Sequence, residues 1–161
     1  MPDSTPVVYD VHIWVDALVG EDSTYPHIPA IPVSTDNPSA DCLSIAFDAD
    51  GFAVWSSPHI LTNTARVLRE LGVGDNTTEA YIAQLYEIIE DSGGFVVEPP
   101  RAAFDFRDHE DNLILDLALV AEALIVVSDD ADLTPLSPWK GRLILRPHQF
   151  VQHVVHSRRT R

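Results

Sequence analysis

The sequence predicts an α/β fold, a three-layer α/β/α sandwich with a mainly parallel central sheet. Short apolar runs rich in β-branched residues alternate along the chain with longer segments whose apolar residues recur at helical spacing. Strands that alternate with helices usually pair in parallel, because each helix returns the chain across a face of the sheet. The 161 residues, 45% of them hydrophobic, can bury one core. We expect a single domain over residues 1–161, with its core at about 7–152 and a short basic tail at 153–161.

The first expected elements are a strand and a short helix separated by a long loop. Residues 7–15 (VVYDVHIWV) are rich in β-branched and aromatic side chains and predict a buried strand that ends or bends near Asp10. Residues 21–41 contain four prolines among Ser, Thr and Asp, and they predict a loop. This loop suits a lid or a partner-docking segment, and it suits an ordinary solvated surface loop at least as well. Residues 39–50 predict the short helix.

A second strand and two amphipathic helices are expected next. The segment FAVWSS at 52–57 predicts the strand, and Pro58 suits the start of a helix at 59–71. The apolar residues of that helix fall on one stripe, and a glycine follows its last turn. A further helix is expected to begin with Thr78 as its N-cap and to end at a glycine pair.

The second half of the chain predicts three strands and two helices. Residues 95–99 predict a short strand. A helix is expected from 111 to about 123, and it is apolar on most of its circumference, so it should pack between the sheet and another helix. Residues 124–128 and 142–147 predict buried strands, and residues 148–155 predict a closing helix.

The sequence favours a cytoplasmic protein without a membrane anchor. Cys42 is the single cysteine, so no internal disulfide can form and a reducing compartment is favoured. The acidic N-terminus lacks the basic and apolar regions of a signal peptide. The longest apolar stretch, 113–127, is interrupted by Asp116 and Glu122, which does not suit a membrane span.

The charge balance opposes long-range attraction to nucleic acid. The acids outnumber the bases by 25 to 10, which gives a formal net charge of -15, and residues 1–65 contain no Lys or Arg. Phosphate binding is normally driven by clustered Lys and Arg side chains. Acids that hold divalent cations would invert the local sign of the charge, so a metal site would weaken this objection.

Four aspartates stand where apolar runs begin or end: Asp10, Asp111, Asp130 and Asp132. The carboxyl ends of parallel strands meet at one edge of a sheet, so Asp10 and Asp130 are expected to lie together there. Converging carboxylates repel one another unless protons or cations intervene, and hard cations such as Mg²⁺ suit oxygen ligands best. Asp129 should face away from this edge. Asp116 is excluded because it lies about 140° around its helix from Asp111.

These acids also have structural interpretations. Asp111 suits a helix cap with a favourable dipole interaction. Asp130 and Asp132 suit a turn stabilised by hydrogen bonds from side chain to backbone. Asp10 is harder to explain in this way, because an acid within an apolar strand is costly. Glu110 and the scattered histidines are expected to be solvated surface residues.

The order of these segments resembles that of the PIN-domain nucleases, most closely the bacterial PIN-family toxins of toxin-antitoxin systems. The resemblance covers about residues 7–152 and is most specific over residues 108–133, DHEDNLILDLALVAEALIVVSDDADL. Family members carry an Asp at the end of the first strand and a Glu on the helix after the second strand. They also carry an Asp that opens a later helix and an Asp in a (Thr/Ser)-Gly-Asp-x-Asp-Leu segment.

Three of these four family positions are acidic in this chain. Asp10 matches the first position and Asp111 the third, and Asp130 with Asp132 matches the fourth. The second position falls on Asn63, whose neutral amide coordinates Mg²⁺ weakly. His12 stands where a small polar residue is usual. His12 and Asn63 are therefore candidates for contact with the substrate or with the metal ligands.

The resemblance implies a metal-dependent ribonuclease that acts as the toxin of a toxin-antitoxin pair. The aspartates at the three matched positions would hold one or two Mg²⁺ or Mn²⁺ ions for the hydrolysis of RNA phosphodiester bonds. RNA is the expected substrate and a small antitoxin protein the expected partner, and PIN toxins also often form homodimers. The alternative, favoured by Asn63 and His12, is a degenerate PIN domain that binds metal or a protein partner without nuclease activity.

Overall fold

The computed structural model describes residues 4–29, 34–102 and 109–160, and it has the predicted α/β architecture. Within these residues the sheet has four parallel strands in the order β2-β1-β3-β4. The strands are β1 (Thr5–Tyr9), β2 (Phe52–Trp55), β3 (Ile125–Val127) and β4 (Leu143–Leu145). The register places Tyr9 opposite Val127, so the next residues, Asp10 and Ser128, leave the sheet at the same edge.

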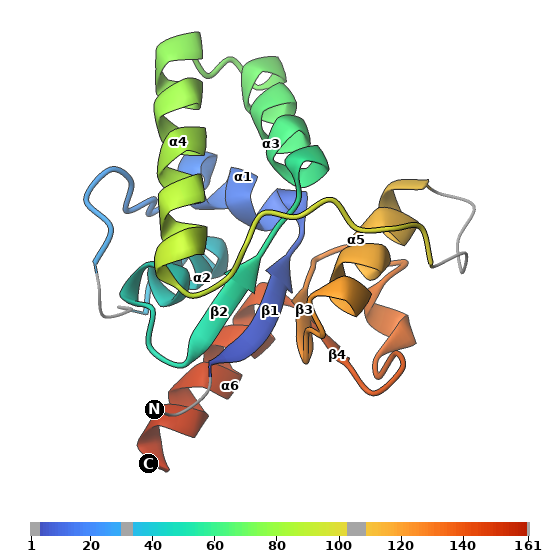
Figure 1. The fold of residues 1–161 in the computed structure, drawn as a ribbon. Helices are drawn as coiled ribbons and strands as arrows, with labels where there is room; N and C mark the ends of the chain where they lie inside the picture. Colours follow the sequence, from blue (N-terminus) through green and yellow to red (C-terminus); the bar gives the residue numbers. More distant parts are fainter. Residues whose placement is uncertain (1–3, 30–33, 103–108, 161) are drawn as a thin grey trace.

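Six α-helices surround the sheet in the described part of the chain: α1 (Val11–Val19), α2 (Pro38–Asp48), α3 (Pro58–Glu70), α4 (Asp75–Asp91), α5 (His109–Val120) and α6 (Pro147–Arg159). A short 3₁₀ turn, η1 (Thr134–Leu136), joins β3 to β4. Figure 1 shows α5 in front of the sheet and α6 behind it, so helices cover both faces. The helices α3 and α4 pack side by side beyond the carboxyl ends of β1 and β2 (Figure 1). None of the helices in the described residues is long and apolar enough to cross a membrane.

A buried aromatic cluster anchors the end of β1. The Tyr9 ring centroid lies 5.0 Å from that of Trp14 and 5.9 Å from that of Phe150. The Tyr9 hydroxyl also donates a hydrogen bond to the Cys42 carbonyl oxygen at 2.8 Å. Because Trp14, Cys42 and Phe150 belong to α1, α2 and α6, one side chain ties three helices to the end of one strand. The next residue, Asp10, therefore starts from a well-fixed position.

The strand expected at 7–15 ends near Asp10, as one of the two expectations had it, but the residues after Asp10 form a helix that was not predicted. The strand β1 ends at Tyr9, and Asp10 is the N-cap of α1, with its carboxylate accepting a hydrogen bond from the Val11 amide at 2.8 Å. The apolar residues of α1 recur at helical spacing and pack against the core: Val11, Trp14, Val15 and Leu18. This spacing outweighs the preference of the individual β-branched residues for strands.

Other helix boundaries also differ from those expected. The helix α2 begins at Pro38 with Asn37 as its N-cap, so the expected loop at 21–41 is shorter at its carboxyl end. The helix α4 has Gly74 as its N-cap, and the expected cap, Thr78, is buried within the helix. The helix α5 ends at Val120 instead of 123, and Glu122 adopts a positive φ in the turn that leads into β3.

Two segments near the sheet differ more clearly. Residues 95–99 add no strand to the sheet, because only an isolated bridge joins Val96 to Ser56. The expected basic tail is largely helical, since α6 continues to Arg159. The Arg158 guanidinium lies 3.0 Å and 3.1 Å from the two carboxylate oxygens of Asp48 on α2. This pair fixes the last turns of α6 against the domain, so the helix belongs to the core fold.

Candidate active site

A pocket of about 270 Å³ opens at the carboxyl edge of β1 and β3, between α3 and α5. Five of the six candidate site residues line it: Asp10, His12, Asn63, Asp111 and Asp130. The sixth, Asp132, lies next to Asp111 and Asp130. The expectation that Asp10 and Asp130 share one edge of the sheet is therefore confirmed. We call this candidate site the active-site pocket.

The carboxylate of Asp10 is held by two hydrogen bonds at the start of α1. Its Oδ1 accepts from the Val11 amide at 2.8 Å, and its Oδ2 accepts from the Ser128 hydroxyl at 2.8 Å. Burial raises the pKa of Asp10, and the nearby charge of Asp130 raises it further, while these hydrogen bonds and His12 oppose the change. The opposing effects mean that Asp10 stands in a site where its negative charge is costly and a cation would be favourable.

Ser128 connects the two strand ends. Its hydroxyl donates to Asp10 and accepts a hydrogen bond from the Asp130 amide at 3.0 Å. The Asp10 amide donates to the Val127 carbonyl at 3.0 Å, which continues the pairing of β1 with β3 up to the pocket. The backbone of Asp130 is therefore held by the same hydroxyl that positions the side chain of Asp10.

Three carboxylates converge next to Asp10. One oxygen from each of Asp111, Asp130 and Asp132 lies within 4.8 Å of the others. Asp111, in the first turn of α5, is 6% exposed, whereas Asp130 is half-buried and Asp132 is exposed. The Asp132 amide donates to Asp130 Oδ1 at 2.8 Å, so the expected turn interaction is also present. Asp111 lies within the first turn of α5 and is not the cap that was expected, because the helix begins at His109.

The neutral side chain of Asn63 contacts an acid from another helix. Its Nδ2 donates to Glu110 Oε2 at 3.0 Å and lies 3.0 Å from His59 Nε2. Glu110 Oε2 and His59 Nε2 also contact each other directly. All three side chains line the active-site pocket. Glu110 is exposed and His59 is partly exposed, as expected of surface residues, but they also contact each other and Asn63, which was not expected.

Two further acids lie outside the active-site pocket, as expected. Asp116 is buried, and its Oδ2 lies 3.1 Å from Nε of Arg101. Its Oδ1 accepts a hydrogen bond from the Ala102 amide at 2.8 Å, so this acid holds the segment before α5. Asp129 points to the other side of the turn after β3, where its Oδ1 lies 3.5 Å from Nη1 of Arg146.

Sequence reasoning missed two residues of the pocket, His59 and Glu110, and also Ser128, which lies behind it and hydrogen-bonds to Asp10 and Asp130. Each had a signal. His59 precedes Asn63 by four residues, so both lie on one face of α3. Glu110 directly precedes Asp111, and its role depends on α5 beginning two residues earlier than expected. Ser128 ends the apolar run before Asp130, at the edge of the sheet where the carboxylates were expected.

Comparison with known proteins supports the family resemblance. No curated protein matches the chain. A family model described as the PIN domain matches residues 6–132, which include β1 through the acidic turn after β3. PIN domains are usually metal-dependent nucleases, and a carboxylate cluster of the kind that binds divalent metal ions is present here. Because the match covers most of the sequence, the chain belongs to the PIN-domain family.

Proposed function

We propose that this PIN domain is a metal-dependent ribonuclease, the toxin of a toxin-antitoxin pair, and that it hydrolyses RNA phosphodiester bonds. One observation carries the proposal, which is the meeting of carboxylates from distant parts of the chain in one pocket. Asp111, Asp130 and Asp132 lie within 4.8 Å of one another, and Asp10 lines the same pocket. Such a group of like charges is costly unless it binds a cation.

The donor set suits Mg²⁺ or Mn²⁺. All the donors are carboxylate oxygens, which hard divalent cations prefer. Two oxygens on opposite sides of Mg²⁺ lie about 4.2 Å apart, so oxygens within 4.8 Å of one another need little movement to share an ion. We assign Asp10, Asp111, Asp130 and Asp132 as the residues that would hold it. A bound ion would lower the pKa of a water molecule and offset negative charge on the phosphate.

Other pocket residues position these acids and the substrate. Ser128 and the Val11 amide hold the Asp10 carboxylate in one orientation, so this side chain would lose little conformational entropy when a substrate binds. Arg66 and His12 line the same pocket and offer N–H donors that suit a phosphodiester. Arg66 is one of few bases in this acidic chain, so its place beside the carboxylates supports the binding of an anionic substrate.

We further propose that Glu110 replaces the acid that family members carry at the position of Asn63. Asn63 donates to Glu110 Oε2, so the amide on α3 holds a carboxylate that comes from α5. The carboxylate therefore lines the pocket beside Asn63, although its sequence position is different. This arrangement would conserve the negative charge of the pocket.

The second candidate function is a PIN domain that binds metal or a protein partner without cutting RNA. The partial exposure of Glu110 and its contact with His59 favour this alternative, because a carboxylate engaged with an imidazole is less available to a metal ion. The net charge of -15 also opposes the approach of RNA.

The deciding experiment compares RNA cleavage with Mn²⁺ by the wild type and by Asp10→Asn. Asparagine is also a good N-cap, so this variant should keep the start of α1. We expect cleavage to be at least about 100-fold slower, because metal ligation supplies several kcal/mol of transition-state stabilisation. Asp91→Asn, which removes an exposed charge at the end of α4, is the matched control and should cleave like the wild type.

Equal cleavage by the wild type and Asp10→Asn would show that the assigned site is wrong. A wild type that binds Mn²⁺ but leaves a range of RNA substrates intact would establish the binding-only alternative. The toxin assignment has its own test, in which induced expression of the wild type should arrest growth and Asp10→Asn should not. Co-expression of a small protein encoded next to this chain should then restore growth.

A further inference from the structure

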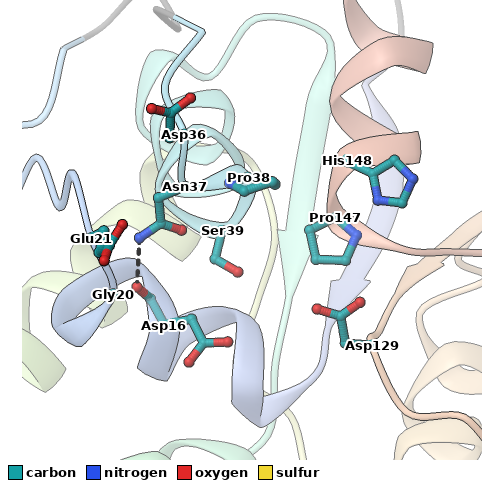
Figure 2. A pocket seen from close by; sticks show the side chains of 10 residues that line it. All are labelled: Asp16, Gly20, Glu21, Asp36, Asn37, Pro38, Ser39, Asp129, Pro147 and His148. Atoms are coloured by element: carbon teal, nitrogen blue, oxygen red, sulfur yellow. Dashed lines mark hydrogen bonds between the residues drawn. The ribbon is translucent and has the colours of Figure 1, made fainter.

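A second pocket, of about 260 Å³, lies on the side of the turn after β3 to which Asp129 points. Its lining residues come from the end of α1, the start of α2, this turn and the start of α6. We call it the α1–α2 pocket. Figure 2 shows the carboxylates of Asp16 and Asp129 and the hydroxyl of Ser39 directed toward the space between them. Glu21 and Asp36 stand at its outer rim (Figure 2).

The α1–α2 pocket combines four carboxylates with little positive charge: those of Asp16, Glu21, Asp36 and Asp129. Among these acids only Asp129 forms an ion pair within the described residues, and its distance to Arg146 is 3.5 Å. Burial raises the pKa of Asp16, His12 opposes this change, and the charge of Asp129 adds to the increase. The two central carboxylates therefore repel each other without a cation between them.

The hydroxyl of Ser39 at the base of the pocket points to a ligand independently of these charges. Ser39 is 4% exposed, and Figure 2 shows its Oγ directed into the pocket. In the part of the chain that the structure describes, no hydrogen bond engages this hydroxyl. Buried polar side chains are usually hydrogen-bonded, so an unpartnered one that faces a pocket suits a group that arrives with a bound molecule.

The position of the acids on α1 also needs an explanation beyond folding. Asp16 lies in the last turn of α1 and Glu21 just beyond its end, where the helix dipole disfavours negative charge. The last turn of α1 contains no basic residue to compensate. Two acids at a helix end where the dipole is already negative destabilise the helix, but they suit a binding site for a cation.

The wall of the pocket is rigid at this helix end. Asn37 Nδ2 donates to the Asp16 carbonyl at 2.8 Å, which ties the end of α1 to the start of α2. A side chain at Gly20 would bring its Cβ within 2.6 Å of both atoms of this hydrogen bond, so only glycine fits. The pocket is therefore preorganised, which lowers the cost of binding.

The size and spacing of the groups identify the class of cation. Among the described residues, the acids of this pocket form no group of three with oxygens close enough to hold one metal ion, unlike those of the active-site pocket. A volume of about 260 Å³ is below that of most drug-sized ligand sites, which hold about 300–1,000 Å³. Carboxylates that face each other across a small space suit a planar cation with donors on several edges.

We infer that the α1–α2 pocket binds a guanidinium group, with Asp16 and Asp129 accepting its charged N–H donors and Ser39 Oγ accepting another. A guanidinium presents five N–H donors in a planar fork, which matches carboxylates on two sides. The group could belong to an arginine side chain of a protein partner or to a free small guanidine, since both present the same chemistry. The inference does not rest on the proposed ribonuclease activity.

The test titrates the full chain with blocked acetyl-arginine amide while backbone amide NMR shifts are recorded. The salt concentration should be about 150 mM, where the Debye length is about 8 Å, to suppress unspecific attraction to the acidic surface. We expect saturable shifts at Gly20, Ser39 and His148, which surround the pocket. Asp16→Asn should weaken binding at least about fivefold, and Asp16→Asn with Asp129→Asn should abolish it, because charge-assisted hydrogen bonds are lost.

Two matched ligands separate the guanidinium from simpler causes. Acetyl-citrulline amide has nearly the same shape without the charge, and tetramethylammonium has the charge without N–H donors. Equal shifts with either ligand would overturn the inference, as would unchanged arginine binding in the double variant with a native-like spectrum. Stronger shifts of the same amides by Mg²⁺ would overturn it too, because they would indicate a metal site.

Two further arms identify the source of the guanidinium. Agmatine represents a free small guanidine, and a blocked pentapeptide with a central arginine represents a protein partner. Binding of both supports a pocket that an arginine of a partner can enter, whereas binding of agmatine alone supports a site for a small molecule. Binding of neither, together with failure of acetyl-arginine amide, would overturn the inference. Asp91→Asn controls for the loss of one negative charge elsewhere and should bind like the wild type.

Discussion

The active-site pocket and the α1–α2 pocket have nearly equal volumes, about 270 Å³ and 260 Å³, and both are acidic. They differ in how their carboxylates are placed. In the active-site pocket three acids bring oxygens within 4.8 Å of one another, and Ser128 holds two strand ends together. In the α1–α2 pocket the acids come from the end of α1, the residues before α2 and the turn after β3, and they leave a space between them (Figure 2).

This difference shows that the number of acids in a pocket does not determine its ligand. Carboxylates that converge can share one small cation, whereas carboxylates that face each other across a gap need a larger one with several donors. Adjacent residues of one turn serve the two arrangements, since Asp130 lines the first pocket and Asp129 lines the second. Extended chain points successive side chains in opposite directions, so a single segment supplies both sites.

The largest difference between the two pockets is expected for variants of Glu110, the acid on α5 that contacts Asn63 on α3. Glu110→Gln should weaken Mn²⁺ binding about tenfold by calorimetry, because the active-site pocket loses negative charge close to the other carboxylates. Asn63→Glu alone should tighten Mn²⁺ binding, since it places an acid at the family position. The double variant, Glu110→Gln with Asn63→Glu, should return the affinity to within about twofold of the wild type.

The exposed acid Asp91 again provides the control, because Asp91→Asn removes the same charge far from α5. An Asn63→Glu variant with unchanged Mn²⁺ affinity would mean that this position lies outside the reach of the metal. Arginine binding in the α1–α2 pocket should not change in any of these variants. A parallel loss in both pockets would indicate a general effect of charge, and the distinction between the two sites would fail.

The sequence predicted the layers and the parallel sheet correctly because its apolar periodicity changes clearly between strands and helices. It placed the end or bend of β1 near Asp10 but did not predict α1, because the residues after Asp10 continue the run of β-branched and aromatic residues of the strand. The switch from strand to helix occurs at the one acid in this run, which caps the helix. A capping aspartate and an aspartate inside a strand look the same in sequence, so tertiary packing had to decide between them.

The candidate site, like the fold, was predicted in part. The rule that parallel strands end at one edge predicted that Asp10 and Asp130 lie together, whereas the family resemblance added Asp111. The structure places these three acids in one pocket, with Asp132 next to Asp111 and Asp130. Glu110 was not predicted, because its contact with Asn63 depends on where α5 begins and on how α3 and α5 face each other. The α1–α2 pocket was not predicted either, since its acids come from three separate segments with no common pattern: the end of α1, the residues before α2 and the turn after β3.

A smaller effect is expected at Ser128, whose hydroxyl serves only the active-site pocket. Ser128→Ala loses a donor to Asp10 Oδ2 and an acceptor for the Asp130 amide, both in a largely buried place. Urea denaturation should show a loss of about 1–2 kcal/mol in the free energy of unfolding. Mn²⁺ affinity should fall by a few-fold, because Asp10 and Asp130 become less well oriented. Unchanged Mn²⁺ affinity, or weaker arginine binding in the α1–α2 pocket, would contradict this division of roles.

The smallest effect is expected for the free energy of unfolding of the protein, which should depend on pH through Asp16 in the α1–α2 pocket. Burial raises the pKa of Asp16 above its ordinary value of 3.8, so the folded protein binds this proton more tightly than the unfolded chain does. Ionised Asp16 therefore costs stability, and the cost develops as pH rises from 3.8 through the raised pKa. Asp16→Asn removes the cost and should stabilise the ligand-free protein at neutral pH by less than about 0.5 kcal/mol, since solvent screens this partly exposed group. Urea denaturation should show that the gain exceeds that of Asp91→Asn and disappears below the ordinary pKa. A variant less stable than the wild type at neutral pH would mean that the Asp16 carboxylate already has a stabilising partner, and the pocket would then need no cation.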